Sequence, residues 1–106
     1  MTRWITVAPS KDLPPGQRQC VEVEGHHVIL FNQGGELFAI ENVCPHAGLP
    51  LADGALAGRT LICPYHGYCF DIKSGKNVDY EDDIPVRTFA IREENGELQI
   101  EFDVKS

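Results

Sequence analysis

Residues 44–71 read CPHAGLPLADGALAGRTLICPYHGYCFD and hold three of the four cysteines of this 106-residue chain. Two short loops stand out in this stretch. One runs from Cys44 to His46 and the other from Cys63 to His66, so each offers one thiol and one imidazole, and sixteen residues separate the loops. Thiolates and imidazoles are common ligands of transition metals, so we expect Cys44, His46, Cys63 and His66 to form a metal centre.

Two kinds of metal centre compete for this ligand set. A structural zinc ion usually takes pairs of ligands with two to four residues between them, and the single residue between Cys44 and His46 fits that spacing poorly. A binuclear iron–sulfur centre can use two cysteines on one iron and two histidines on the other, which matches one of each per loop. A cysteine nucleophile with His66 as its base is a third reading, but it gives the loop at Cys44 no role.

The two loops resemble the cluster-binding loops of Rieske proteins in the residues CPHAG at 44–48 and CPYHGYCFD at 63–71. The residues PVRTF at 85–89 and the Asn95-Gly96 turn also resemble the third loop and closing strands of Rieske-type ferredoxins. The resemblance covers most of the chain. It implies one Rieske-type [2Fe–2S] cluster per chain, bound by the four ligands above, on an antiparallel β base that carries a small cluster subdomain.

Two departures from the high-potential Rieske proteins refine this resemblance. Those proteins have a disulfide between the loops, at positions that Leu49 and Tyr65 occupy here. They also have serine and tyrosine hydroxyls bonded to the cluster sulfurs, at positions that Tyr68 and Phe70 occupy here. We therefore expect a reduction potential near the lower end of the Rieske range, which spans roughly −150 to +300 mV.

Short runs of β-branched and aromatic residues between turn signals predict an all-β fold, an antiparallel sandwich or barrel in one domain of residues 1–106. Glu24-Gly25 and Asn95-Gly96 are typical of tight hairpin turns. The aromatic residues at 4, 31, 38, 89 and 102 are expected in the core. The segment 42–84, rich in glycine and proline, reads as a cluster-binding subdomain inserted into a base of residues 1–41 and 85–106. Strands are expected at residues 3–7, 18–23, 26–31, 36–41, 86–92 and 98–102, with shorter ones at 59–62 and 68–72.

Charge and cysteine usage narrow the partners and the location. Nine basic and sixteen acidic residues give a formal net charge of −7, which disfavours nucleic acid and anionic membranes as partners. Acidic runs at residues 79–83 and 93–103 suit a basic docking surface on a protein. No apolar run reaches the ~20 residues of a membrane span and no export signal is evident, so we expect a soluble cytoplasmic protein with Cys20 and Cys69 free.

The function implied by the resemblance is a one-electron carrier, not an enzyme. It would take electrons from a flavoprotein NAD(P)H reductase and pass them to a terminal oxygenase. The remaining histidines, His26 and His27, are neighbours on a strand and point to opposite faces, so they cannot build the second iron site of an oxygenase. Alternatives are the small subunit of an assimilatory nitrite reductase and a zinc-stabilised binding module. We expect a monomer.

Overall fold

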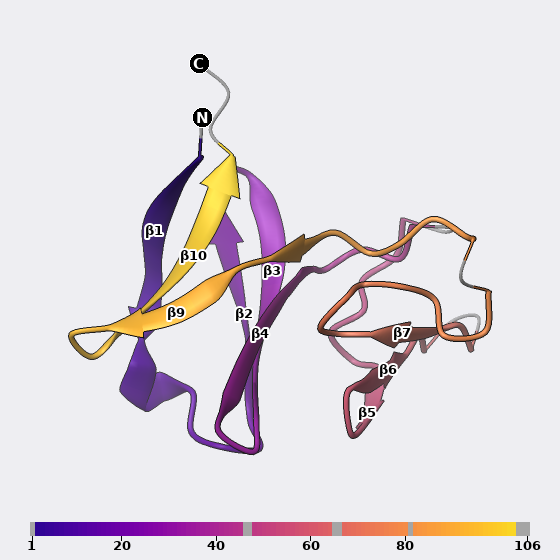
Figure 1. Ribbon diagram of the computed structural model, residues 1–106, viewed down its shortest axis with the longest axis horizontal. Coiled ribbons are helices and arrows are strands. Elements are labelled where there is room, and N and C mark those ends of the chain that lie inside the picture. The colour runs from indigo at the N-terminus through magenta and orange to yellow at the C-terminus, as the bar shows by residue number, and fades with distance from the viewer. Residues whose placement is uncertain (1, 46–47, 65–66, 81, 104–106) are drawn as a thin grey trace.

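The computed structural model describes residues 2–45, 48–64, 67–80 and 82–103, and these residues form three antiparallel sheets (Figure 1). The first sheet has the order β1-β10-β9, the second β2-β3-β4-β8 and the third β5-β6-β7. A single 3₁₀ turn, Ser10–Asp12, follows β1 within the described part of the chain. The strands are β1 (Thr2–Pro9), β2 (Arg18–Val23), β3 (His26–Gln33), β4 (Glu36–Glu41), β5 (Ala55–Ala57), β6 (Thr60–Ile62), β7 (Cys69–Asp71), β8 (Thr88–Phe89), β9 (Ile91–Glu94) and β10 (Glu97–Asp103).

The expected hairpins of the base are confirmed. Glu24 and Gly25, between β2 and β3, have φ angles of 51° and 80°, and Asn95 and Gly96, between β9 and β10, have φ angles of 52° and 79°. Two consecutive positive φ angles define the turn whose twist matches paired strands. The start of β1 and the end of β10 lie side by side, since Thr2 pairs with Asp103.

The strand expected over residues 86–92 is wrong as a single element. Thr88–Phe89 (β8) pairs with β4 in the second sheet, whereas Ile91–Glu94 (β9) pairs with β10 in the first. The chain crosses from one sheet to the other at Ala90, whose carbonyl accepts a hydrogen bond of 2.9 Å from the N–H of Glu101. Chains that switch sheets in this way form the corners between packed sheets, and an unbroken apolar pattern does not reveal the change.

The centre of the second sheet, in β3 and β4, is buried, and β3 packs apolar side chains on both of its faces. In β3, Val28 and Leu30 join the core shared with the first sheet, whereas Ile29 and Phe31 join a second core on the opposite face. All four side chains are at most 1% exposed. A strand covered on both faces has a continuous apolar run, which explains the sequence VILF at 28–31.

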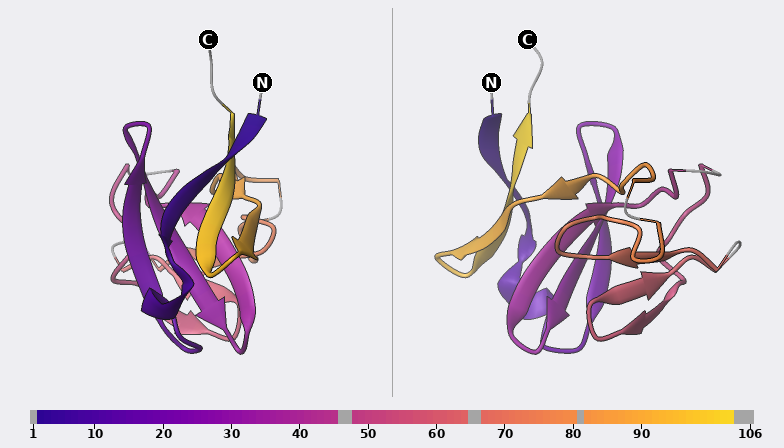
Figure 2. Two further views of the ribbon diagram at one scale, coloured as in Figure 1. Left: turned by 90° about the vertical axis from the view of Figure 1, so that its left-hand side faces the viewer. Right: turned by 45° about the vertical axis from the view of Figure 1, so that its right-hand side comes forward.

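The inserted segment, residues 42–84, covers the outer face of that second sheet. Its Leu51, Leu61, Phe70 and Ile72 share one buried cluster with Phe31 and other base residues. Figure 1 and the right-hand view of Figure 2 show the β5-β6-β7 sheet beside the base. Strands β6 and β7 correspond to the two short strands expected there, while β5 was not expected because its sequence, Ala-Leu-Ala, has no strand signature.

Four of the five aromatic residues expected in the core are buried, namely Phe31, Phe38, Phe89 and Phe102. Trp4 is wrong as a core residue, because it lies half-buried on the first sheet with the guanidinium of Arg92 4.1 Å from its ring centre. This cation–π contact stabilises the Trp4 ring at a place where the core does not cover it. No helix among the residues described is long and apolar enough to cross a membrane.

Candidate metal centre

The first cysteine loop starts directly after β4 and closes on itself by two backbone hydrogen bonds. The N–H of Cys44 donates to the carbonyl of Leu49 at 2.8 Å, and the N–H of Gly48 donates to the carbonyl of Cys44 at 2.8 Å. Gly48 has a φ angle of 68°, which a residue with a Cβ adopts only at a cost. The loop therefore returns to its starting point within six residues.

The second cysteine loop has the same closure. The N–H of Cys63 donates to the carbonyl of Tyr68 at 2.7 Å, and the N–H of Gly67 donates to the carbonyl of Cys63 at 3.0 Å. Gly67 has a φ angle of 71°, close to that of Gly48 in the first loop. The two loops thus share the same pattern of backbone hydrogen bonds. They do so although they lie nineteen positions apart in sequence and differ by one residue in their Cys-to-His spacing.

Both thiols at the starts of these loops are buried in the same core. Cys44 is 0% exposed and Cys63 is 1% exposed, and both belong to the apolar cluster beneath the inserted segment. All four cysteines of the chain are free of disulfides. A pair of unbridged, buried thiols on matched loops suits a soft metal centre, because thiolate is the soft ligand that iron–sulfur clusters select.

The first side chain of the inserted segment, that of Asn42, fixes the end of the first loop. The Oδ1 atom of Asn42 accepts hydrogen bonds from the N–H groups of Leu51 at 2.6 Å and Ala52 at 3.0 Å. The N–H of Asn42 in turn donates to the carbonyl of His27 in β3 at 2.8 Å. Asn42 thus links the loop that begins at Cys44 to the central sheet.

The β6–β7 hairpin holds the second loop. Ile62 pairs with Cys69 and Leu61 pairs with Phe70, so the residues between them form the hairpin tip. The register places Leu61 and Phe70, both fully buried, on the core face. The apolar burial that orders the hairpin therefore also positions Cys63.

A third stretch lies next to this hairpin and is shaped by Asn77. Asn77 bridges Phe70 and is fully buried, and its Oδ1 atom accepts hydrogen bonds from the N–H groups of Asp79 at 3.0 Å and Tyr80 at 3.2 Å. Its Nδ2 atom has no hydrogen-bond partner among the residues that the structure describes. A turn between Asp71 and Gly75 precedes this stretch, and in it the N–H of Gly75 donates a hydrogen bond of 2.7 Å to the carbonyl of Asp71.

The histidines of the expected ligand set, His46 and His66, lie outside the described residues. The other two histidines point to different partners, as expected for neighbours on a strand. His26 Nδ1 lies 2.8 Å from the Oε2 atom of Glu41, and His27 Nε2 lies 3.7 Å from the Oε2 atom of Glu22. Among residues whose placement is described, no group of three histidine, cysteine or acidic side chains could hold a metal ion.

The two remaining cysteines lie apart from the loop starts. Cys20 is exposed on β2. Partial burial of its sulfur raises the pKa of the Cys20 thiol, the carboxylate of Asp53 raises it further and the guanidinium of Arg18 lowers it. Cys69 opens β7, and its Sγ atom lies 3.6 Å from the carbonyl oxygen of Gly67.

Sequence reasoning missed three residues that support the loops, namely Asn42, Asn77 and Arg18. Arg18 in β2 donates hydrogen bonds to the carbonyls of Ala52 at 2.8 Å and Gly54 at 2.7 Å. Asn42 had a local signal, since it stands directly before the first loop. Arg18 had none, because its partners lie more than thirty residues away.

The arrangement of two matched loops on an antiparallel β base defines a class, and comparison with protein families identifies it. Residues 3–90 match the Rieske [2Fe-2S] domain. The chain belongs to this family, whose members bind a Rieske-type [2Fe–2S] cluster. The two cysteines fit that cluster, because it takes one thiolate pair on one of its irons.

Relatives of similar length are electron carriers of oxygenase systems. The chain is 31% identical over 100 residues to the ferredoxin component of the naphthalene 1,2-dioxygenase/salicylate 5-hydroxylase systems of Ralstonia sp., covering 94% of this chain and 96% of the relative. A ferredoxin of Sphingomonas yanoikuyae B1 superposes with a TM-score of 0.83 at 27% identity, covering 95% of this chain and all of that one. A ferredoxin in complex with the oxygenase of carbazole 1,9a-dioxygenase gives a TM-score of 0.81 at 26% identity, covering 92% and 91%.

Proposed function

We propose that Cys44, His46, Cys63 and His66 ligate the [2Fe–2S] cluster, and that the chain carries single electrons from a flavoprotein NAD(P)H reductase to a terminal oxygenase. The observation that carries this proposal is the shared closure of the loops at Cys44 and Cys63, with both thiols buried in one core. The carrier role agrees with the relatives, which are ferredoxin components of dioxygenase systems. One such relative is in complex with its oxygenase.

The bound cluster supplies one-electron redox chemistry. The residues of the chain bind it and control its surroundings. Cys44 and Cys63 would hold one iron from the core side, where their burial excludes water from the sulfurs. Asn42 and the β6–β7 hairpin keep the two loops at fixed positions, which limits the rearrangement that accompanies each electron transfer. Neutral imidazoles of His46 and His66 on the other iron would favour the reduced state more than thiolates would.

Further parts of the proposal concern organisation. The inserted segment, residues 42–84, would be the cluster-binding subdomain of a single domain spanning 1–106. The chain would act as a cytoplasmic monomer, because a carrier with one cluster visits its donor and its acceptor in turn. Of the alternatives, the small subunit of a nitrite reductase and the zinc module have no support from the relatives of similar length.

The test is spectroscopy of the purified protein with iron and acid-labile sulfide analysis. Two irons, two sulfides and a Rieske-type EPR spectrum after anaerobic reduction are expected. Cys44→Ser and Cys63→Ser are expected to lose the cluster. Cys20→Ser and Cys69→Ser provide matched controls, because they remove a thiol that has no place in the ligand set, and they are expected to keep the full spectrum. Loss of the spectrum in a control, or its survival in both Cys44→Ser and Cys63→Ser, would refute the ligand assignment.

A further inference from the structure

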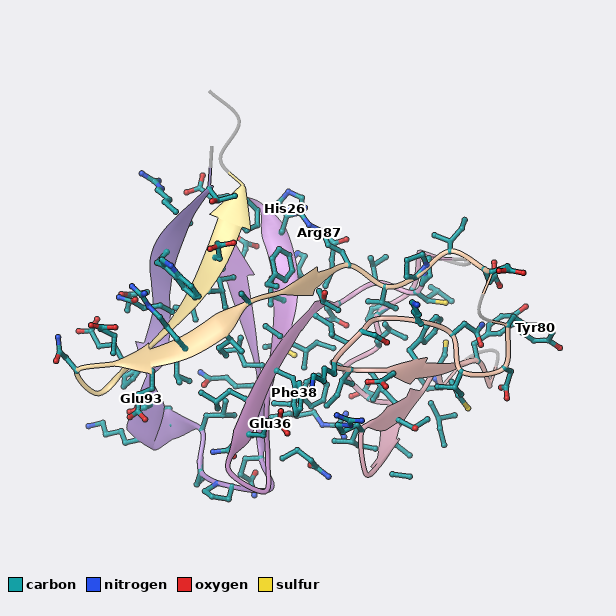
Figure 3. The ribbon with its side chains drawn as sticks, in the orientation of Figure 1. His26, Glu36, Phe38, Tyr80, Arg87 and Glu93 are labelled. Carbon is teal, nitrogen blue, oxygen red and sulfur yellow. The ribbon has the colours of Figure 1, made fainter. Side chains whose placement is uncertain are left out.

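The large apolar side chains that the described residues expose to solvent all lie in the inserted segment. Leu49 is 37% exposed, Val78 46%, Ile84 59% and Tyr80 62%. Three of these four belong to one stretch, residues 78–84, which we call the 78–84 loop. Figure 3 shows Tyr80 at one end of the molecule and Glu93 at the opposite end. Several exposed apolar side chains on one short loop are typical of an interaction surface.

The same loop is acidic and has no basic residue. Asp79 lies between Val78 and Tyr80, and Asp82 follows shortly after, both exposed. The sequence from Asn77 to Val86 holds no lysine or arginine. Exposed apolar side chains are interspersed with carboxylates, so a partner that contacts the loop meets both apolar groups and negative charge.

Hydrogen bonds shape the described parts of the loop, residues 78–80 and 82–84, and so fix how these parts present their side chains. Asn77 caps its start through the N–H groups of Asp79 and Tyr80. The N–H of Asp83 donates to the carbonyl of Tyr80 at 3.0 Å, and the Oδ1 atom of Asp83 accepts from the N–H of Ile84 at 2.9 Å. A surface that is ordered before binding loses less conformational entropy when a partner docks.

We propose that the 78–84 loop is the docking surface for a redox partner protein whose contact area has an apolar centre and a rim of lysine or arginine. This inference rests on the proposed function, because it assigns the partner of that electron carrier. Charge complementarity selects the occupant: the loop carries only negative charge, and the whole chain has a formal net charge of −7. A second copy of the chain would bring the same negative charges together, and anionic membranes and nucleic acid would be repelled.

The two kinds of side chain have separate roles in such a complex. Asp79 and Asp82 attract a basic partner at long range and raise the association rate, an effect that salt screens. Tyr80, with Val78 and Ile84, supplies the apolar contact after the encounter. Removing the charges is therefore expected to change the salt dependence, and removing the ring to lower the rate even at high salt.

The experiment uses the holoprotein, reduced with dithionite and freed of excess reductant, and a basic cytochrome c as the probe. One electron passes from the reduced protein to the ferric haem, and stopped-flow absorbance records the rate across ionic strength. The test variant is Asp79→Lys with Asp82→Lys. The matched control is Glu93→Lys with Glu101→Lys, two exposed positions on the first sheet, and each pair raises the formal net charge from −7 to −3. Tyr80→Ser tests the apolar contact.

At low ionic strength the double variant at Asp79 and Asp82, the loop pair, is expected to slow electron transfer at least tenfold. The double variant at Glu93 and Glu101, the control pair, is expected to slow it less than threefold. Tyr80→Ser is expected to lower the rate at least threefold at high ionic strength without changing its salt dependence. Equal slowing by the two charge pairs, or no slowing by the loop pair, would overturn the docking surface. The EPR spectrum of each variant separates the two proposals, since an intact Rieske-type spectrum upholds the carrier function whatever the rates show.

Discussion

Arg18 in β2 donates a hydrogen bond of 2.7 Å to the carbonyl oxygen of Gly54, and so joins the base to the inserted segment. The same guanidinium nitrogen donates to Ala52 at 2.8 Å, and the group lies 5.4 Å from the ring centre of Phe31. Gly54 itself has no room for a side chain, because a Cβ there would overlap the carbonyl oxygen of Ile62. Arg18 thus binds the backbone of Ala52 and Gly54, and Gly54 is also tightly packed against Ile62.

Replacing Arg18 with glutamine is expected to lower the free energy of unfolding by about 1–3 kcal/mol, since hydrogen bonds from a charged donor to partly buried carbonyls are lost. Loss of these hydrogen bonds also frees the segment that follows the first cysteine loop. The cluster is therefore expected to be lost faster on heating, with a faster decay of its visible absorption. Arg92→Gln is the matched control, because Arg92 contacts Trp4 on the first sheet, away from the inserted segment. Urea unfolding and the loss of visible absorption with temperature measure both effects. Equal destabilisation by the two variants would contradict a specific role for Arg18.

Replacing Gly75 with alanine is expected to destabilise the protein strongly, by roughly 3 kcal/mol or more, because strain and steric overlap add. Gly75 has a φ angle of 79°, and its Cβ would overlap the carbonyl oxygen of Val86. Gly96→Ala is a close control. Gly96 has the same φ angle of 79° with nothing within 4 Å of a Cβ, so only the backbone strain remains, about 1 kcal/mol. The difference in urea midpoints between the two variants measures the steric part.

Sequence alone predicted the parts of this molecule that depend on local chemistry. The turn at Asn95-Gly96 and the strand boundaries of β2 and β4 follow from residue types that favour one backbone geometry. The crossing of sheets at Ala90 could not be predicted, because a strand that changes partners keeps the same apolar alternation. The hydrogen bonds of Arg18 could not be predicted either, because they join residues that only the fold brings together.

In the candidate site, too, some features could be predicted from the sequence and others could not. The pairing of one cysteine with one histidine at 44–46 and again at 63–66 indicated the two loops, and the structure adds that both close by the same pair of hydrogen bonds. The ligand roles of His46 and His66 stay predictions. The exposed apolar side chains of the 78–84 loop were unexpected, since strand alternation describes the base and says nothing about a loop whose residues face a partner.

The reduction potential is expected near the lower end of the Rieske range, below zero on a scale that spans roughly −150 to +300 mV. One reason lies in β7, which follows the second cysteine loop, because Phe70 is fully buried there and has no hydroxyl to donate to a cluster sulfur. Fewer hydrogen bonds to the sulfurs leave the reduced cluster less stabilised. Protein-film voltammetry of the wild type measures the potential directly, and a value well above zero would contradict this expectation.

The Cys20 thiol is expected to react slowly at mildly alkaline pH, because burial of its sulfur and the nearby Asp53 carboxylate both raise its pKa. Only the thiolate attacks an alkylating reagent, so the pH profile of iodoacetamide labelling reports this pKa. The Cys69→Ser background leaves Cys20 as the cysteine outside the proposed ligand set. Asp53→Asn is expected to shift the labelling profile to lower pH and Arg18→Gln to higher pH, because Arg18 lowers the pKa.

The same raised pKa has a consequence for stability, with a definite sign. A thiol whose pKa is higher in the folded state than in the unfolded state keeps its proton to a higher pH when the protein is folded. Its contribution to the free energy of unfolding is therefore complete below the unfolded pKa and is lost as pH rises through the folded pKa. Cys20→Ser is therefore expected to flatten the decline of the urea midpoint at alkaline pH. The effect is small because the residue is exposed. A decline that is equally steep in Cys20→Ser would assign the alkaline loss of stability to other groups.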